Sequence, residues 1–301
     1  MTPSIDRFDS NPLLEVGGGP GLEENVNGPS LIRVPDWVGN SLGRYYLYFA
    51  HHEGATIRLA WADHIEGPYT VHEPGALHLA DSCFPTSRPD GVPDMFYAHI
   101  ASPDVHVLEE EREIRMYFHG WHSDGRQLTR VATSTDGLNF TVREELLGPS
   151  YFRVFRHGGA WYALAMPGLL LRSEDGLTNF VPGPRLFNKD MRHSAVLLHD
   201  DLLHVFYTQA HSAPESILYA TIDVSSDWQD WRETPPQFVA APQTFWEGSE
   251  EPNEPSKRGA ILTRVHQLRD PAVFEEGGQT YLFYSGGGEY AIGGSRLTLP
   301  A

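Results

Sequence analysis

Several short apolar segments of the chain begin with side chains that can exchange protons or bind polar ligands. Arg269 and Asp270 precede a proline at the start of one segment, and Arg192 and His193 stand at the start of another. A carboxylate can act as a general base, and an imidazole titrates close to neutral pH, so it can donate or accept a proton. These residue types indicate acid–base chemistry or recognition of a polar small molecule, provided that the fold brings them together.

The segments that carry these residues have the pattern of short β-strands. They are rich in aromatic and β-branched residues and are bounded by Gly, Pro, Asp and Asn, while no long segment has helical periodicity. A strand ending in aromatic residues recurs at 44–54, 114–125, 160–168, 203–212 and 280–289. Each follows another apolar run, at 27–34, 102–108, 151–155, 192–198 and 269–274. Third strands follow, and Asp-Gly turns at 134–140 and 173–180 lead to fourth strands.

This repeat predicts an all-β fold, a five-bladed β-propeller with four antiparallel strands per blade. A β-sandwich with similar strands is the alternative. We expect a single domain over residues 1–301, closed by the N-terminal segment, with a long loop on the site face at 241–268. The blades are expected at 27–75, 99–145, 151–185, 192–240 and 269–299. The aromatic residues expected in the packing between strands are Phe155, Phe206, Tyr207, Phe283 and Tyr284.

Five such blades, the Asp-Pro pair before an inner strand and the S-x-D-G hairpins resemble the five-bladed propeller glycosidases. The resemblance is to glycoside hydrolase families 43 and 117, with families 32 and 68 more distant, and it covers the chain from about Asn27 to Leu299. The turn in 62–70, which contains Gly-Pro-Tyr, is similar to one in their first blade. The resemblance implies a glycosidase, although such propellers also host phosphorylases, transferases and binding modules.

Alignment of the repeats places Asp270 in one column with Gly28, Ser102, Tyr151 and His193. In a propeller the innermost strands line the central channel, so this column is expected at one pocket. An Asp before a proline can merely cap a turn, and a histidine at a strand end is often structural, but recurrence at the same strand end favours a site. The substrate-binding residues expected on this face are Asn27, His51, His52, His119, Trp121, Arg192, His211, Trp246, Arg269 and Glu289.

Glycoside hydrolysis uses two carboxyl groups on either side of the scissile bond. The resemblance implies an Asp at the start of the first blade, but this chain has Asn27 and Gly28 there. Asp270 and Glu247 of the long loop are the expected working carboxyl groups. His193 is the third expected catalytic residue, because the resemblance to family 117 implies that a histidine can be the proton donor; His266 is an alternative donor.

Composition limits the partners. The chain has a formal net charge of −18, whereas nucleic acids and anionic membrane surfaces attract clustered Lys and Arg, so neither is expected as a partner. Cys83 is the lone cysteine, and the first residues lack the basic and apolar regions of a signal peptide, so a cytoplasmic location is expected. The expected partner is a carbohydrate-like small molecule, and the sequence does not fix the oligomeric state.

A second hypothesis is a propeller that binds a sugar-like polar metabolite without hydrolysing it, or one that uses a histidine-held metal. No cofactor is expected, but a metal stays open because histidines are assigned to the site face without diagnostic spacing. The possible ligands are His51, His52, His119, His122, His193 and His211. Two carboxyl groups facing each other across the pocket would favour hydrolysis, and three clustered imidazoles would favour a metal.

Overall fold

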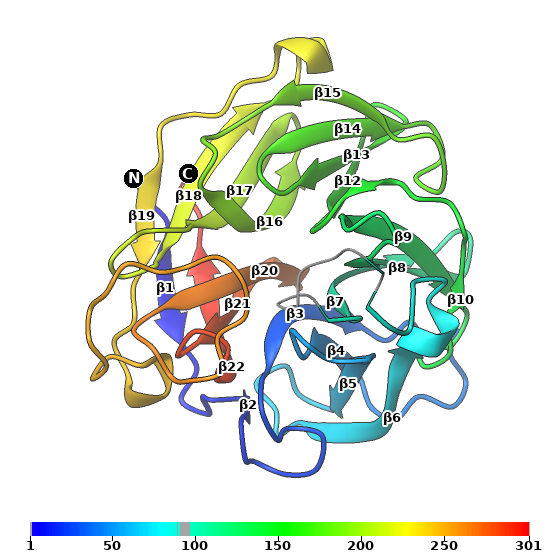
Figure 1. The fold of residues 1–301 in the computed structure, drawn as a ribbon. Helices are drawn as coiled ribbons and strands as arrows, with labels where there is room; N and C mark the ends of the chain where they lie inside the picture. The colour runs from blue at the N-terminus through cyan, green and yellow to red at the C-terminus, as the bar shows by residue number, and fades with distance from the viewer. Residues whose placement is uncertain (1, 89, 91–96, 301) are drawn as a thin grey trace.

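A computed structural model describes residues 2–88, 90 and 97–300 and has five antiparallel sheets arranged around a central channel (Figure 1). The predicted all-β five-bladed propeller is confirmed. Blade 1 comprises β3 (Asn27–Arg33), β4 (Tyr45–Ala50), β5 (Thr56–Ala62) and β6 (Thr70–His78). Blade 2 comprises β7 (Ile100–Leu108), β8 (Glu113–Trp121) and β9 (Gln127–Ser134), and both β10 (Thr141–Val142) and β11 (Gly148–Pro149) pair with β9.

The remaining blades follow in chain order around the channel (Figure 1). Blade 3 comprises β12 (Arg153–His157), β13 (Ala160–Ala165), β14 (Leu169–Ser173) and β15 (Val181–Arg185). Blade 4 comprises β16 (Met191–His199), β17 (Leu202–Gln209), β18 (Ile217–Asp223) and β19 (Gln237–Ala240). Blade 5 comprises β20 (Leu268–Glu276), β21 (Gln279–Gly286) and β22 (Ala291–Thr298). Three short 3-10 helices, η1 (Leu79–Asp81), η2 (Trp228–Asp230) and η3 (Phe245–Glu247), lie in the connections.

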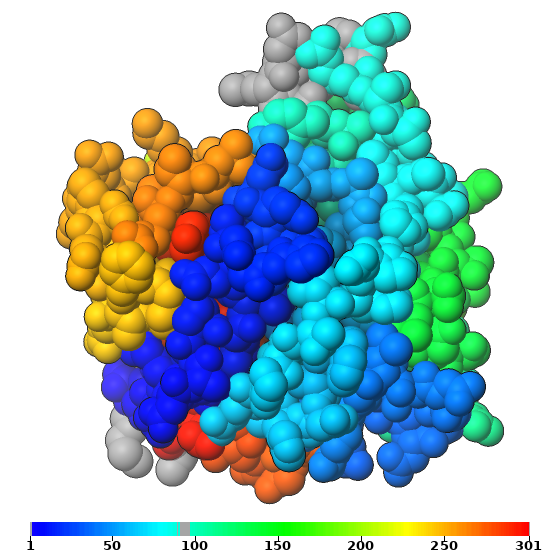
Figure 2. Space-filling view, turned by 90° about the horizontal axis from the view of Figure 1, so that it is seen from below, coloured from blue at the N-terminus to red at the C-terminus, as the bar shows by residue number. Residues whose placement is uncertain are grey.

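The N-terminal segment closes the ring. Strand β1 (Ser4–Arg7) pairs with β22 as the outermost strand of blade 5, and β2 (Leu14–Glu15) pairs with the other end of β22. Asn11 Nδ2 donates a hydrogen bond to Gly294 O at 2.8 Å. In Figure 2 the dark blue N-terminal segment lies between the orange residues of the long loop that precedes blade 5 and the cyan residues of blade 1. The first and last blades are therefore tied by one continuous segment.

The innermost strand of each blade leaves regular extended geometry at the same place. The backbone φ is positive at Gly28 (59°), Ser102 (53°), Tyr151 (66°), His193 (46°) and Asp270 (49°). In blades 1, 2, 4 and 5 a register shift accompanies it, between Asn27 and Ser30, Ala101 and Asp104, Arg192 and Ser194, and Arg269 and Ala272. A bulge re-aims a side chain, and a positive φ is costly outside glycine, so such strain is concentrated at functional sites. The aligned column of the sequence is thus one repeated structural feature.

The blades are held together by large side chains at their contacts. All five aromatic residues expected in this packing are buried: Phe155, Phe206, Tyr207, Phe283 and Tyr284. Apolar residues alternate with inter-blade hydrogen bonds such as Tyr48 OH to Gly137 O at 2.8 Å, which joins blade 1 to the hairpin of blade 2. A rigid ring of this kind holds the strand starts, and the side chains on them, at fixed positions around the channel.

Candidate functional site

The strand starts surround a cavity of about 520 Å³, which we call the upper cavity. Its wall includes four of the five residues with positive φ, and Gly28 lies beside it: a Cβ on Gly28 would meet Ser102 Cα at 3.3 Å. The described residues that line it are Asn27, His52, Ala101, Ser102, His119, Trp121, Gly125, Arg126, Gln127, Leu128, Pro149, Ser150, Tyr151, Met166, Arg192, His193, Arg258, Gly259 and Asp270. Its size and its convergent polar groups suit a small polar ligand.

Asp270 lies at the centre of a buried cluster. Tyr151 OH donates a hydrogen bond to Asp270 Oδ1 at 2.8 Å, and His193 Nδ1 lies 3.6 Å from the same oxygen. The rings of Tyr151 and His193 are stacked with centroids 5.2 Å apart. Burial, followed by the charge of Glu289, raises the pKa of Asp270 above its ordinary value, so this carboxylate is a stronger base than an exposed one.

Arg192 fixes the protonation of His193. Its Nε and Nη2 groups point at His193 Nε2 at 3.1 and 2.9 Å. A guanidinium only donates, so His193 Nε2 accepts and the proton of the neutral imidazole lies on Nδ1, the atom that faces Asp270. Burial and the neighbouring guanidinium groups of Arg192 and Arg269 hold the pKa of His193 well below its ordinary value. His193 is therefore neutral, which contradicts the prediction that it is the proton donor with a pKa near neutrality.

His52 has the opposite electrostatic surroundings. Its Nδ1 lies 3.3 Å from Glu289 Oε1, and Glu289 also accepts hydrogen bonds from Arg269 Nη1 at 2.8 Å and Asn25 Nδ2 at 2.7 Å. Burial opposes the charge on His52, but the carboxylate of Glu289 outweighs it and raises the pKa of His52. The pKa of Glu289 is lowered well below its ordinary value despite burial, with His52 the main cause. His52 is thus a lining imidazole that a buried carboxylate orients and keeps protonated near neutral pH.

Two buried arginines share one further carboxylate behind the cavity. Glu215 lies 3.7 Å from both Arg192 Nε and Arg269 Nε and accepts a hydrogen bond from Thr208 Oγ1 at 2.7 Å. Its side chain is fully buried. Buried guanidinium groups require such compensation, because an unpaired charge in the interior is strongly destabilising. Glu215 therefore holds together the groups that position His193 and Glu289.

His119 adds a neutral imidazole to this wall, and His99 packs behind it. Burial lowers the pKa of His99 to about 4 and holds the pKa of His119 well below its ordinary value. His99 Nδ1 donates to Tyr97 O at 2.9 Å, and its ring contacts those of His52, His119 and Trp121. Within the described residues, His119 Nδ1 is buried without a hydrogen-bond partner. A buried unpaired nitrogen is costly, so it marks a place where a ligand could bind.

The long loop predicted at 241–268 reaches this cavity with its second half. Lys257 O accepts hydrogen bonds from Arg192 Nη1 at 2.9 Å and Arg269 Nη2 at 3.3 Å, and Gly259 O accepts one from Arg269 Nη1 at 3.2 Å. Arg258 and Gly259 line the cavity. The loop backbone is thus held on the two buried arginines and forms part of the cavity wall.

The first half of the loop does not fit the roles predicted for it. Glu247 caps η3: it accepts hydrogen bonds from the backbone of Gln243 and Thr244, from Arg7 Nε at 2.7 Å and from Tyr284 OH at 2.8 Å. Its carboxylate is fully buried and lies outside the cavity lining. Trp246 stacks on Tyr284 with centroids 5.7 Å apart, inside blade 5. Neither the catalytic role of Glu247 nor the sugar-stacking role of Trp246 is compatible with these positions.

Of the remaining predicted residues, some line the cavity and others do not. Asn27, His52, His119, Trp121 and Arg192 line it, while Arg269 and Glu289 are buried behind it. His51 is directed toward Glu24 at 3.7 Å, and His211 is exposed beside Asp190 at 3.9 Å. Neither of these two histidines belongs to the lining. Residues that we did not assign from sequence include His99, Arg258 and Glu215; only Tyr151 and Ser102 carried a signal, through their place in the aligned column.

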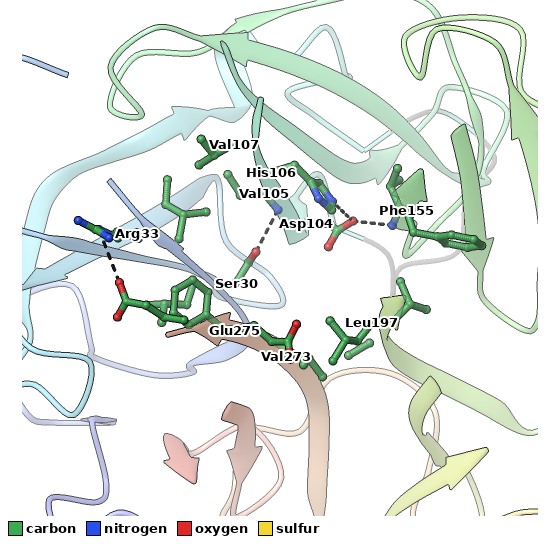
Figure 3. A pocket seen from close by; sticks show the side chains of 18 of the residues that line it. Ser30, Arg33, Asp104, Val105, His106, Val107, Phe155, Leu197, Val273 and Glu275 are labelled. Carbon is green, nitrogen blue, oxygen red and sulfur yellow. Dashed lines mark hydrogen bonds and ion pairs between the residues drawn. The ribbon is translucent and has the colours of Figure 1, made fainter. Parts of the chain in front are cut away.

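A larger cavity of about 700 Å³, which we call the lower cavity, lies where the innermost strands end (Figure 3). Its wall mixes apolar residues such as Val105, Val107 and Leu197 with charged ones such as Glu275 and Glu276. Asp104 is turned into local contacts there: its Oδ2 atom is 2.8 Å from His106 Nε2 and accepts a hydrogen bond from Val154 N at 2.8 Å.

Arg153 separates the two cavities. It lines the lower cavity, while its guanidinium lies 4.1 Å from the ring of Tyr151, which lines the upper one. Its Nε donates to Ser194 O at 2.8 Å. The two ends of the channel are therefore distinct sites, and the smaller one contains the aligned column.

The arrangement bears on both hypotheses from the sequence. Among the described residues that line the upper cavity, Asp270 supplies the one carboxyl group, so a facing pair of carboxyl groups is not present in that set. No group of three or more His, Cys, Asp and Glu side chains in the described part of the chain could hold a metal ion. The chemistry available here is that of one carboxyl group and one oriented imidazole.

The fold defines a class before any sequence comparison: a five-bladed propeller of the kind found in glycoside hydrolases. A family 43 enzyme from Xanthomonas citri complexed with xylotriose superposes with a TM-score of 0.61 at 14% identity, covering 96% of this chain and 90% of that one. The family 43 β-xylosidase/α-arabinofuranosidase CoXyl43 from a compost microbial metagenome gives 0.61 at 15% identity, with coverage of 99% and 96%. An exo-β-1,3-galactanase from Phanerochaete chrysosporium gives 0.61 at 12%, with coverage of 97% and 64%.

Sequence comparison identifies a relative of the chain and thereby its family. The uncharacterized protein R118 of Acanthamoeba polyphaga mimivirus is 34% identical over 301 residues, covering 91% of this chain and 83% of R118. The chain belongs to the family of R118. No protein-family model matches it. Helices in the described part of the chain lack the length and hydrophobicity that crossing a bilayer requires.

Proposed function

We propose that the protein is a glycoside hydrolase that acts on a small sugar or short oligosaccharide bound in the upper cavity. The observation that carries this proposal is the opening of a carboxylate, Asp270, and a carboxylate-oriented imidazole, His52, into one cavity. The fold shared with family 43 enzymes supports it, and the titled ligands of those structures include xylose and xylotriose. The acid–base pair differs from the two carboxyl groups of most glycosidases.

In this proposal Asp270 is the base. It accepts the proton of a water molecule while the water oxygen attacks the anomeric carbon of the sugar. Tyr151 OH holds the carboxylate of Asp270 in place through the hydrogen bond that it donates to Oδ1 at 2.8 Å. The raised pKa of Asp270 makes the ionised carboxylate a stronger base.

His52 is the acid in the same step. Its imidazolium donates a proton to the glycosidic oxygen as the bond between that oxygen and the anomeric carbon breaks. Glu289 orients the ring through Nδ1 and raises the pKa of His52, so the protonated form is populated near neutral pH. His52 replaces His193, whose low pKa makes it a positioning group for Asp270 rather than a proton donor.

A panel of aryl glycosides tests this function. Aryl xylosides, arabinofuranosides and galactosides release a coloured phenol on hydrolysis, and we expect turnover with at least one sugar. Since a positioned acid contributes about 100-fold or more, His52→Gln should lower kcat with a poor leaving group by about that factor. With a highly acidic phenol, which needs little protonation, the loss should be much smaller. His211→Gln, an exposed histidine outside the cavity, is the matched control and should retain full activity. Equal losses with both leaving groups would contradict the acid role.

A propeller that binds a sugar without hydrolysing it is the second candidate. The observation that favours it is that Asp270 supplies the single carboxyl group among the described lining residues. This candidate predicts no turnover of any glycoside in the panel together with measurable binding of a free sugar by calorimetry. Asp270→Asn would then change the affinity for that sugar, whereas turnover of any glycoside at the upper cavity excludes a pure binding role.

A further inference from the structure

The upper cavity has a charge balance opposite to that of the whole protein. The chain carries a formal net charge of −18, yet the described lining residues include three guanidinium groups, those of Arg126, Arg192 and Arg258, against the single carboxyl group of Asp270. Charges that line a cleft set the local potential and attract ligands of the opposite sign. The lining therefore favours a ligand with negative charge.

Arg258 is the guanidinium with spare capacity. It is exposed at the cavity rim and donates a hydrogen bond from Nη2 to Lys189 O. Across the described residues no carboxylate forms an ion pair with it, and Asp190, whose pKa the charge of Arg258 helps to lower, is bound to Lys189 at 3.0 Å. Arg126, by contrast, is paired with Asp124 at 2.6 Å. Arg258 can thus bind an anion without first breaking an ion pair.

Polar groups continue from Arg258 into the cavity. Arg192 and Arg258 meet at the same loop segment, since Arg192 Nη1 donates to Lys257 O, the carbonyl next to Arg258. His119, which is only 5% exposed, lines the same cavity with its Nδ1 unpaired among the described residues. A buried polar atom without a partner indicates a ligand or solvent group that completes it. The cavity thus offers a buried nitrogen that a bound ligand can satisfy, close to charged guanidinium groups.

We propose that the sugar bound in the upper cavity carries an anionic group, a carboxylate or a phosphate ester, that binds between Arg258 and Arg192. This inference rests on the proposed function, because it names the substrate class of the same site. Guanidinium groups suit both anions, since each presents oxygens that a planar fork of N–H groups can engage together. The sugar ring would occupy the space between this anion and Asp270.

Isothermal titration calorimetry with matched sugar pairs tests the proposal. The pairs are glucose with glucuronate, galactose with galacturonate, and glucose with glucose 6-phosphate, so that each pair differs at one carbon. We expect at least one anionic member to bind about 10-fold or more tightly than its neutral partner, the scale of one charged hydrogen bond. Uronates and the phosphate ester serve as separate arms that identify the anion.

Two variants locate the effect. Arg258→Gln should weaken binding of the anionic sugar by about 10-fold and leave the neutral sugar unchanged. Arg185→Gln is the matched control: Arg185 is also exposed and also donates one hydrogen bond to a backbone carbonyl, that of Pro167, but it lies outside the cavity. It should bind all sugars as the wild type does. Equal melting temperatures of the two variants show that both are folded.

The outcomes separate this inference from the proposed function. Neutral members that bind as tightly as anionic ones, or tight anion binding that Arg258→Gln leaves intact, would overturn the inference while leaving a sugar site. Inorganic phosphate that binds in an Arg258-dependent way, with no sugar binding at all, would support the anion site and remove the glycosidase proposal. Absence of binding by every probe would overturn both.

Discussion

The cavities at the two ends of the central channel differ in backbone geometry and in the partners of their polar groups, and volume alone would favour the lower one as the functional site. The lower cavity is larger, at about 700 Å³ against about 520 Å³, and it also contains an acid–histidine pair, Asp104 and His106. There Asp104 is engaged by local partners, His106 and the backbone N–H of Val154. At the upper end the backbone departs from regular geometry in all five blades, and His119 Nδ1 lacks a partner among the described residues.

This difference shows what distinguishes a binding site from a gap left by the architecture. A propeller leaves space along its axis wherever the inner strands diverge. A site needs side chains that converge on that space with hydrogen-bonding capacity left over, and backbone strain is one sign that folding has been compromised to place them. The backbone strain found at the upper end in all five blades therefore supports our proposal that the smaller upper cavity is the functional one. A change at the upper end is compared below with a change at the lower end, or with the group that sets the pKa values of the upper pair.

The largest expected effect is on stability, at Glu215. Glu215→Gln keeps the shape but removes the charge that compensates Arg192 and Arg269, so two buried guanidinium groups lose a partner. We expect the free energy of unfolding to fall by about 3–5 kcal/mol in urea denaturation. Glu276→Gln at the lower end, where the ion pair with Arg33 is partly exposed, should cost less than about 1 kcal/mol. Similar losses for the two variants would mean that the upper network is no more tightly coupled than a surface pair.

Activity should separate the two aspartates at opposite ends of the channel. Asp270→Asn removes the base and should lower kcat by at least about 100-fold with any glycoside that the wild type hydrolyses. Its melting temperature should hold or rise, because the raised pKa of Asp270 shows that burial already disfavours its charge. Asp104→Asn should leave kcat unchanged. Loss of activity in the Asp104 variant would place the chemistry at the wrong end of the channel for this account.

The pH dependence of kcat/KM should report the upper pair. Asp270 must be ionised and His52 protonated, so activity should rise as pH passes the raised pKa of Asp270 and fall as it passes the raised pKa of His52. Glu289 raises both pKa values, so Glu289→Gln should move both limbs of the profile to lower pH. A profile that stays in place in this variant would exclude Glu289 as the group that sets these pKa values.

The smallest expected effect is the acid sensitivity of the lower end. Burial opposes the charge of Asp104, but His106, Arg153 and the backbone N–H of Val154 outweigh it and lower the pKa. The contribution of Asp104 to stability is therefore present above its unfolded-state pKa and is lost as pH falls through the lowered one. We expect Asp104→Asn to lower the free energy of unfolding by about 1 kcal/mol at pH 7 and by less below a pH of about 4, as measured by urea denaturation at both pH values. If the loss of unfolding free energy were the same at both pH values, the charge of Asp104 would not contribute to stability.

The repeats made the fold and the aligned column predictable, because each blade carries the same strand pattern. The roles within the column were less accessible. His52 depends on Glu289, which comes from another blade, and the neutral state of His193 depends on Arg192 and burial, neither of which a strand pattern reveals. Glu247 was assigned to catalysis because it lies in the loop that leads to Asp270.

The loop did contain a local signal against that assignment. Thr244 and Glu247 form a capping box, in which the Glu side chain returns to the backbone of the capping residue. The spacing of Thr and Glu three residues apart is visible in the sequence and predicts this use of the carboxylate. Arg258, in the same loop, belongs to no comparable sequence pattern. Its importance for the proposed anion site lies in the absence of an ion-pair partner among the described residues, which only the folded loop reveals.

A crystal structure of the Asp270→Asn protein soaked with the best-hydrolysed aryl glycoside tests the central claim most directly, because the variant should bind this substrate without turning it over. The account predicts electron density for the sugar in the upper cavity, with the glycosidic oxygen within hydrogen-bond reach of His52 and the anomeric carbon beside Asn at position 270. Density in the lower cavity, between Asp104 and Glu275, would contradict the account.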